Sequence, residues 1–393
     1  MFDDDIREFL RFTARPIGTP ENERATRFLA EHAAARGFEV TRLPFDCLRW
    51  EHGTAWIERG DTRFALHPGE FSSSFEGGAA IAQAQSLDEL RALDCTGKIL
   101  LLHGTIAAEP LMPQEFPFYF PDEHRALYEA LEAAQPVAIV AFTGAHPSCG
   151  QNPFALITDP TFAIPMAFAD VRTFEALDAL DGDALLKIDS RCLPATGEQL
   201  VFRRPAKSEP SRGKLVLCAH MDTAYGTPGA LDNATGIGVL LSVLARLEHW
   251  QGSVELEVLP FNGEDAYGAN GQLAWLATQR PDLSDVLCAM NVDAVAHRGS
   301  KVAISSYGLS DEQTRALDRA MAGKRALTKG EPWFAGDHAI FAFRGIPSLA
   351  LTSSDLVEGV MPLMHTRHDT PDQVDVDLIE RAADFLATWI QGF

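Results

Sequence analysis

The chain has 393 residues, of which 46% are hydrophobic and 22% charged, a composition typical of a globular protein of two or three domains. Its 55 acidic residues outnumber its 33 Lys and Arg residues, which gives a formal net charge of −22. This charge argues against nucleic acid and against an anionic membrane as partner, because both require clustered cations.

Neither the start of the sequence nor its cysteines indicate export. The first sixteen residues lack the apolar stretch of a secretory signal, and no run of about eighteen apolar residues predicts a membrane span. The six cysteines are scattered, without a C-x-x-C pair, which is typical of reduced thiols. We therefore expect a cytoplasmic protein.

The first half of the chain mixes helical and strand patterns. Apolar residues recur at helical spacing over residues 21–37, and a strand is predicted over residues 39–45. Residues 54–66 alternate around a Gly-Asp turn, which predicts a β-hairpin. Short apolar runs follow at residues 98–104 and 137–144.

After about residue 190, strand and helix patterns alternate regularly. Strands are predicted over residues 214–219, 253–261, 286–292 and 347–352. Helices are predicted over residues 233–247, 268–280 and 376–390. This alternation predicts a largely parallel sheet with helices on both faces.

Each of these four predicted strands is followed by carboxylate or imidazole side chains. They are His220, Asp222 and Asp232 after the first strand, Glu264 and Asp265 after the second, Asp293 after the third, and His365, His368 and Asp369 after the fourth. Ligands bind beyond the carboxyl ends of strands in open α/β sheets. One such motif alone is usually a turn or a solvated helix start, but four together indicate a metal site. Imidazole with carboxylate favours zinc over magnesium or calcium, with manganese or cobalt as alternatives.

The ordered motifs HMDT, GALDNATG, FNGEDAYGANG, NVD and MHTRHDTPD resemble those of peptidase family M28, the co-catalytic dizinc peptidases. The resemblance covers residues 1–47 and 190–393. It implies an α/β fold, a three-layer α/β/α sandwich with a mostly parallel mixed sheet. Residues 48–189 resemble, more loosely, the protease-associated domain inserted in many relatives. They would form a smaller β-rich α+β domain that serves as a lid or substrate domain.

The resemblance also implies which residues bind metal. Asp232 would bridge two zinc ions. His220 and Asp293 would complete the first site, and Asp265 and His365 the second. The H-T-x-x-D-T spacing favours His365 over His368 as the metal ligand.

Three further acidic residues receive roles from the resemblance. Glu264 matches the general base, which would take a proton from a water that bridges the two ions and pass it to the departing amine. Asp222 matches the residue that supports the first histidine ligand. Asp369 is expected to support His365 in the same way.

Two positions depart from the family pattern. Many relatives carry Glu-Glu where this chain has Glu264-Asp265, and aspartate is a shorter ligand. Some relatives place a tyrosine, which steadies the oxyanion, where this chain has Met364. Tyr307 and His338 are then the alternatives for that role.

We therefore expect a metallo-exopeptidase acting on peptides, in the first place an aminopeptidase, with its oligomeric state open. A carboxypeptidase or amidohydrolase of the same fold would need a cation for the substrate carboxylate, and Arg298, Arg344 and Arg367 are candidates. A glutaminyl-cyclase-like acyltransferase would use one zinc ion. A non-catalytic binding protein of this fold would usually lack some of the ligands.

Overall fold

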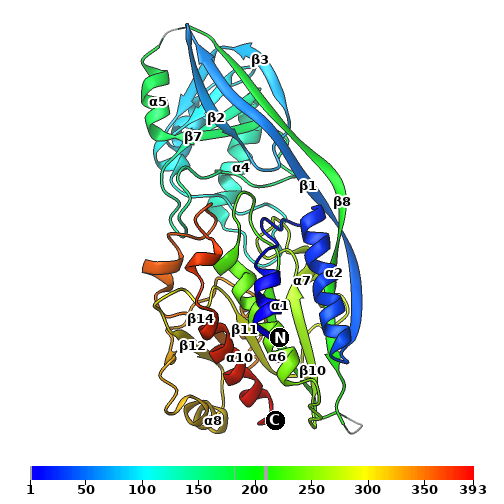
Figure 1. Ribbon diagram of the computed structural model, residues 1–393. Helices are drawn as coiled ribbons and strands as arrows, with labels where there is room; N and C mark the ends of the chain where they lie inside the picture. Colours follow the sequence, from blue (N-terminus) through cyan, green and yellow to red (C-terminus); the bar gives the residue numbers. More distant parts are fainter. Residues whose placement is uncertain (1, 181, 208–210) are drawn as a thin grey trace. The chain divides into compact units, whose positions relative to one another are not determined.

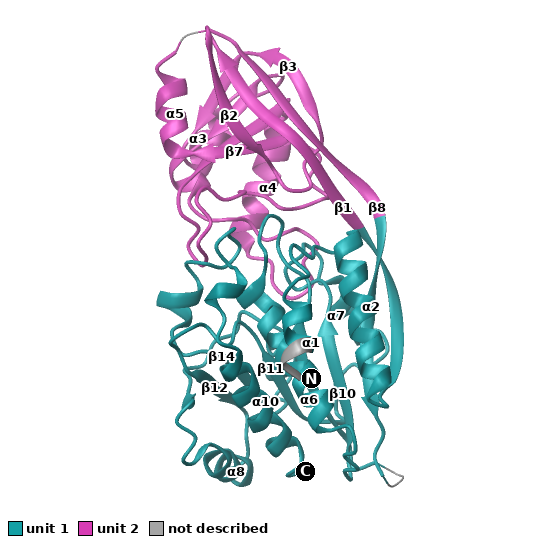
Figure 2. Cartoon of the chain, in the orientation of Figure 1, with its two compact units in different colours: residues 1–47, 195–393 teal, residues 48–194 magenta. Residues whose placement is uncertain are grey.

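The computed structural model describes residues 2–180, 182–207 and 211–393 (Figure 1). The chain forms two compact units, one of residues 1–47 and 195–393 and one of residues 48–194 (Figure 2). We call them unit 1 and unit 2. Two long strands, β1 (Glu39–Arg59) and β8 (Ala184–Arg204), have residues in both units. The chain therefore leaves unit 1 along one strand and returns along the other.

Unit 1 is built on a mixed sheet with the strand order β13-β12-β14-β11-β9-β10-β8. The strands are β9 (Lys214–His220), β10 (Glu255–Phe261), β11 (Val286–Val292), β12 (Val302–Tyr307), β13 (Leu327–Lys329) and β14 (Ser348–Ser353). The four strands β14, β11, β9 and β10 run parallel, whereas β12 pairs antiparallel with β14 and β8 pairs antiparallel with β10. Strand β13 at the edge runs parallel to β12. The central strand β9 is buried along its whole length, as expected when helices cover both faces.

Helices cover both faces of this sheet. They are α1 (Phe2–Phe9), α2 (Pro20–Ala35), α6 (Thr235–Arg246), α7 (Asn270–Leu276), α8 (Asp311–Met321), α9 (Ala339–Ala342) and α10 (Val376–Ile390). Leu215 and Leu217 of β9 pack in one core with α6 and α10, whereas Val216 and Cys218 pack in another with Trp275 of α7. This alternation is the period-two pattern of a strand between two helical layers. The predicted three-layer α/β/α arrangement is confirmed.

Several elements of unit 1 lie where the sequence predicts them. Helix α10 covers the predicted residues 376–390, and α6 begins at Thr235, after a short helical turn, η2 (Ala230–Ala234). The segment β12-α8-β13 was not predicted. The sequence does carry signals for α8 that the prediction did not use. They are a capping box, formed by Ser310 and Gln313, and apolar residues at helical spacing, Ala316, Leu317, Ala320 and Met321.

Unit 2 contains a second sheet with the order β2-β7-β6-β5-β4, in which β7 to β4 run parallel. The strands that lie wholly in unit 2 are β2 (Thr62–Pro68), β3 (Phe75–Ala79), β4 (Ile81–Ala84), β5 (Ile99–Leu102), β6 (Ala138–Thr143) and β7 (Met166–Asp170). Of these, β3 pairs antiparallel with β8. Its helices are α3 (Leu87–Ala92), η1 (Gly104–Ala107), α4 (Asp122–Ala134) and α5 (Val171–Asp178). The predicted hairpin is present, since β1 and β2 pair through Arg59 and Thr62. The likeness of this unit to a protease-associated domain stays a prediction.

Two further helical turns complete unit 1. They are η3 (Leu356–Val360) and η4 (Pro371–Gln373). Both belong to the long connection between β14 and α10, which contains His365. Across the described parts of the chain, no helix is long and apolar enough to span a membrane.

Candidate metal centre

Parallel strands bring the predicted site residues to one edge of the sheet of unit 1. His220 is the last residue of β9 and lies in register with Phe261, the last residue of β10. Asp293 directly follows β11, which is the neighbour of β9 on its other side. The carboxyl ends of three adjacent strands therefore meet at one place, as the sequence argument required.

The structure gathers the five predicted ligands into two groups that share one carboxylate. His220, Asp232 and Asp293 form the first group, and Asp232, Asp265 and His365 form the second. Within each group, the potential ligand atoms lie within 4.8 Å of one another. His220 Nε2 lies 3.1 Å from Asp232 Oδ1, and His365 Nε2 lies 3.1 Å from Asp232 Oδ2. Each carboxylate oxygen of Asp232 therefore faces a different histidine.

The remaining contacts complete each group. His220 Nε2 lies 3.6 Å from Asp293 Oδ1, and His365 Nε2 lies 3.1 Å from Asp265 Oδ1. His220 and Asp232 are 1% exposed, and Asp293 is 7% exposed. Asp265 and His365 retain partial exposure. One group is thus buried, and the other reaches towards solvent.

Two buried carboxylate oxygens support a bound cation. Asp232 Oδ2 and Asp293 Oδ1 accept no conventional hydrogen bond from any residue that the structure describes. Buried polar atoms are normally satisfied, because an unpaired one costs about 1–3 kcal/mol. A divalent cation would satisfy both oxygens. The nitrogen and oxygen donors of the two groups are those that zinc prefers.

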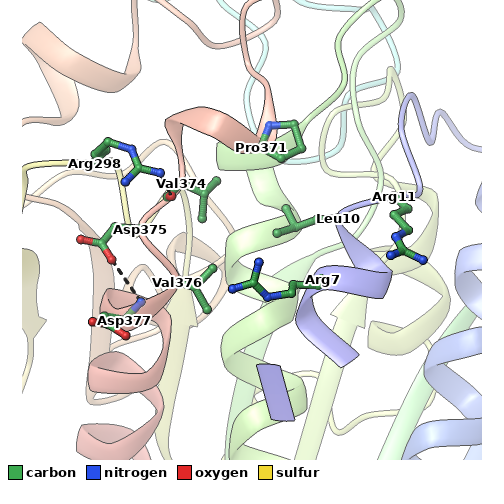
Figure 3. A pocket seen from close by; sticks show the side chains of 9 residues that line it. All are labelled: Arg7, Leu10, Arg11, Arg298, Pro371, Val374, Asp375, Val376 and Asp377. Atoms are coloured by element: carbon green, nitrogen blue, oxygen red, sulfur yellow. Dashed lines mark hydrogen bonds between the residues drawn. The ribbon is translucent and has the colours of Figure 1, made fainter. Parts of the chain in front are cut away.

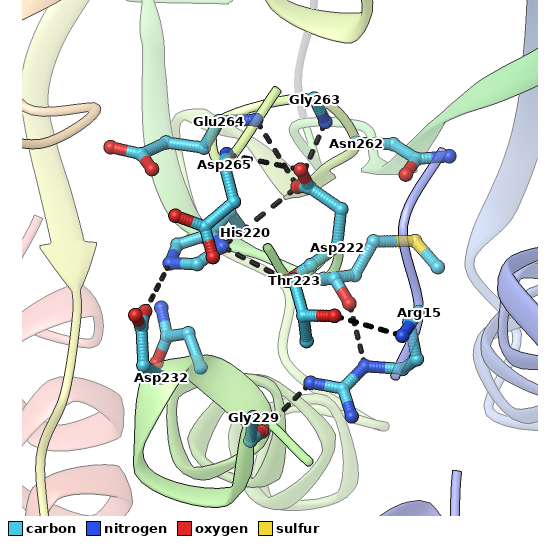
Figure 4. Close-up of polar contacts among 12 residues, drawn as sticks. Arg15, His220, Asp222, Thr223, Gly229, Asp232, Asn262, Gly263, Glu264 and Asp265 are labelled. Carbon is cyan, nitrogen blue, oxygen red and sulfur yellow. Dashed lines mark hydrogen bonds and ion pairs between the residues drawn. The ribbon is translucent and has the colours of Figure 1, made fainter. Parts of the chain in front are cut away.

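Asp222 organises the turn that follows β10 (Figure 4). Its Oδ1 accepts hydrogen bonds from the backbone N–H groups of Gly263 (2.8 Å) and Glu264 (3.1 Å), and its Oδ2 accepts one from Asp265 (3.0 Å). Its Oδ1 also lies 3.8 Å from Nδ1 of His220. Asp222 is therefore placed beside the histidine, as predicted, and it additionally holds the backbone of two other site residues.

Glu264 and Asp265 are adjacent, but their side chains diverge (Figure 4). Asp265 points towards the metal-ligand groups, and its Oδ2 accepts a hydrogen bond from the N–H of Ala224 (3.1 Å). Glu264 keeps some exposure to solvent. This divergence allows one residue to bind metal while the other remains available for proton transfer.

Asp369 and Asn233 hold the shared ligand in place. Asp369 Oδ1 accepts a hydrogen bond from Leu231 N (2.6 Å), and its Oδ2 accepts one from Asp232 N (3.0 Å). Asn233 Nδ2 donates to Val292 O (2.9 Å), which ties this turn to the end of β11. Asp369 therefore supports the backbone of Asp232, whereas the sequence analysis expected it to support the last histidine.

The electrostatics of the site reflect many carboxylates in a dry environment. Burial, reinforced by neighbouring acidic groups, raises the pKa of Glu264 well above its usual range. Burial likewise raises the pKa of Asp293. For His220, burial opposes the charged ring, but contacts with the carboxylates of Asp232 and Asp293 raise its pKa well above the usual value. The surrounding carboxylates thus create a strong preference for positive charge.

The two candidates for oxyanion stabilisation have structural partners instead. The Tyr307 hydroxyl donates to the backbone carbonyl of Trp333 and accepts from its N–H (2.9 Å). His338 is fully buried, and its Nε2 lies 2.7 Å from the same carbonyl. Both rings therefore fix the segment around Trp333.

Two of the three candidate arginines for a substrate carboxylate hydrogen bond to backbone carbonyls, whereas Arg367 is exposed and its Nε lies 3.5 Å from His368 Nε2. Arg298 donates to the carbonyls of Asp372 (3.0 Å) and Val374 (2.8 Å), and Arg344 donates to the carbonyl of Ile340. Arg298 lines a surface hollow in unit 1 (Figure 3). The residues around this hollow are Arg7, Leu10, Arg11, Arg298, Pro371, Val374, Asp375, Val376 and Asp377. It includes none of the five predicted ligands.

The sequence analysis missed the residues that support the site from the N-terminal segment. Arg15 and Asn22 are 0% and 2% exposed and hydrogen bond to the loops that contain the ligands. No periodicity or motif marks such residues, because their partners are up to 240 positions away in the sequence.

The comparison with known families follows this geometry. A model of peptidase family M28 matches residues 200–390. This region of the chain, which contains the predicted ligands, is therefore similar to family M28. The match and the two groups of potential ligands together support a zinc-dependent hydrolase. No curated protein sequence matches the chain significantly.

Solved structures share the fold over both units. An aminopeptidase from Aneurinibacillus sp. strain AM-1 is 17% identical, with a TM-score of 0.74, over 98% of this chain and 92% of its own. A zinc aminopeptidase from Bacillus subtilis is 19% identical, with a TM-score of 0.77, over 100% and 94%. A glutaminyl cyclase from Fimbriiglobus ruber is 12% identical, with a TM-score of 0.50, over 99% and 93%. The fold is thus common to proteins described as peptidases and as a cyclase.

Proposed function

We propose that the protein is a dizinc aminopeptidase that removes N-terminal residues from peptides. The observation that carries this proposal is the shared position of Asp232, whose two oxygens face His220 and His365. We assign His220, Asp232 and Asp293 to one zinc ion, and Asp232, Asp265 and His365 to the other. Manganese or cobalt could replace zinc with the same donors.

Glu264 is the proposed general base. When bound, zinc acts as a Lewis acid that polarises a carbonyl and lowers the pKa of water. The carboxylate of Glu264 accepts the proton of the attacking water and transfers it to the departing amine. Asp222 keeps this carboxylate in position through the backbone N–H of Glu264.

The charge of the site favours an amino terminus as the group that is recognised. Five carboxylates converge there, and a cationic α-amino group is attracted to such a surface. Arg298 and Arg344, which a carboxypeptidase could use, donate to backbone carbonyls. The acidic surroundings therefore support an aminopeptidase over a carboxypeptidase.

The first test compares free and blocked substrates. We expect hydrolysis of aminoacyl substrates with a free α-amino group, none of their N-blocked forms, and loss of activity with a chelator. Equal turnover of free and blocked substrates would refute the N-terminal specificity. Activity that resists the chelator would refute the metal mechanism.

The second test separates the base from the metal ligands. We expect Glu264→Gln to retain two zinc ions per chain while activity falls by at least about a hundredfold. Glu312→Gln, an exposed substitution on α8, is the matched control and should keep full activity. One zinc ion per chain in the wild type, with cyclisation of N-terminal glutamine, would instead favour the cyclase function.

A further inference from the structure

Arg15 lies in the segment between α1 and α2 and contributes no metal ligand, yet it reaches two ligand-bearing loops (Figure 4). Its Nε donates to the carbonyl of Met221 (2.8 Å), directly after His220. Its Nη2 donates to the carbonyl of Gly229 (2.8 Å), three residues before Asp232. One guanidinium therefore joins the loop after β9 to the turn before α6.

Additional bonds fix Arg15 itself. Its Nη1 donates to the carbonyls of Phe12 and Pro228, the latter at 3.3 Å. Its backbone N–H donates to Thr223 Oγ1 (2.9 Å). These side-chain hydrogen bonds of Arg15 all go to backbone carbonyls, so the side chain fixes the backbone conformation of the loops that it contacts. A planar fork of five donors suits several fixed acceptors better than a lysine does.

The same segment also reaches the turn after β10. Asn22 Nδ2 donates to Arg15 O (2.9 Å) and to Asn262 Oδ1 (2.8 Å). Asn262 Nδ2 donates back to Asn22 Oδ1 (3.0 Å). Asn262 immediately precedes the turn that contains Glu264 and Asp265. The N-terminal segment thus contacts three of the loops from which the site is assembled.

The charge of Arg15 is matched to this location. Burial lowers the pKa of Arg15 to about 10, while the carboxylates of Asp369, Asp222, Asp232 and Asp265 oppose that change. The side chain therefore stays cationic at neutral pH. A buried cation is tolerated where hydrogen bonds and nearby negative charges compensate for its lost hydration.

We propose that Arg15 is a positioning residue of the metal centre, which holds the backbone on both sides so that His220 and Asp232 face each other. This inference rests on the proposed metal centre. If Arg15 acted only through its charge, the change in zinc affinity would have the opposite sign. A cation near the site repels zinc, so removal of the guanidinium would then strengthen zinc binding.

Zinc affinity, measured by competition with a chelator, tests the inference without an activity assay. We expect Arg15→Met to weaken zinc binding at least tenfold, the usual effect of losing a residue that supports metal ligands. Arg15→Lys keeps the positive charge but loses the planar set of five donors. The zinc affinity of this variant should therefore lie between those of the wild type and Arg15→Met. The visible absorption of the cobalt-loaded variants should change as well, because it reports ligand geometry.

Lys214→Met is the matched control. Lys214 is a buried cation at the start of β9, the strand that ends at His220, and it donates to Glu257 Oε1 (3.3 Å). This variant should lose stability without losing zinc affinity. Unchanged or tighter zinc binding in Arg15→Met would overturn the inference. If Arg15→Met does not fold, Arg15→Lys decides, and wild-type affinity in that variant refutes the role. A wild-type protein that binds no zinc would refute the proposed centre itself.

Discussion

Gly229 is the position where one added methyl group should disturb the metal centre most. Its φ of +63° is a conformation that costs a non-glycine residue about 1–2 kcal/mol. A Cβ there would lie 2.2 Å from Thr223 Cγ2 and 2.7 Å from the carbonyl of Asp232. Relief of such a clash typically costs a further 1–3 kcal/mol. We therefore expect Gly229→Ala to lower the free energy of unfolding by about 3 kcal/mol and zinc affinity about tenfold.

Gly226→Ala separates the clash from the backbone cost. Gly226 lies in the same loop with a φ of +79°, but a Cβ there would meet nothing within 4 Å. This variant should lose only about 1–2 kcal/mol and bind zinc normally. Urea unfolding and chelator competition measure the two quantities. An equal loss of unfolding free energy and of zinc affinity in the two variants would show that the contacts of a Cβ at Gly229 with Thr223 and Asp232 have no energetic consequence.

Further substitutions test other parts of the site and the fold. Asp222→Ala should weaken zinc binding about 10- to 100-fold because three backbone N–H groups lose their acceptor, whereas Asp159→Ala, which removes a similar backbone acceptor in unit 2, should leave metal analysis and affinity unchanged. Asp232→Asn should reduce bound zinc from two ions to one at most, because an amide offers only one ligand oxygen; two ions bound to the variant would contradict the bridging role. Removal of metal should lower the thermal midpoint, and added zinc should restore it, with a rise that follows the logarithm of the zinc concentration; calorimetry without such a shift would argue against metal binding to the folded state. Ile379→Ala in the core between α10 and α6 should cost about 3 kcal/mol while metal content stays the same.

Much of unit 1 could be predicted because its signals are local. Helix α10 has apolar residues at helical spacing, and the buried strands read as short apolar runs between turns. The ligand types follow those strands directly, so parallel order alone predicts that His220, Asp265 and Asp293 meet at one edge.

The sequence was less informative where a residue's role depends on distant partners. Asp369 was expected to support the last histidine, but the fold places it under the backbone of Asp232. Tyr307 and His338 were candidates for the chemistry, but they pack against each other and hydrogen bond to the Trp333 backbone. Residue type shows what a side chain can do, but its neighbours decide which of those roles it takes.

The sequence by itself therefore determined the layered α/β architecture and the candidate metal ligands, because periodicity, strand-end position and the family's motifs are properties of neighbouring residues. Only the tertiary structure decided which oxygen of Asp232 faces His220 and which faces His365. It also decided that Arg15 hydrogen bonds to the loops that contain His220 and Asp232. The net charge of −22 gave no hint of that buried cation. Three of its partners, the carbonyls of Met221, Pro228 and Gly229, are more than 200 residues away, and a hydrogen bond to a carbonyl leaves no trace in the identity of the residue that provides it.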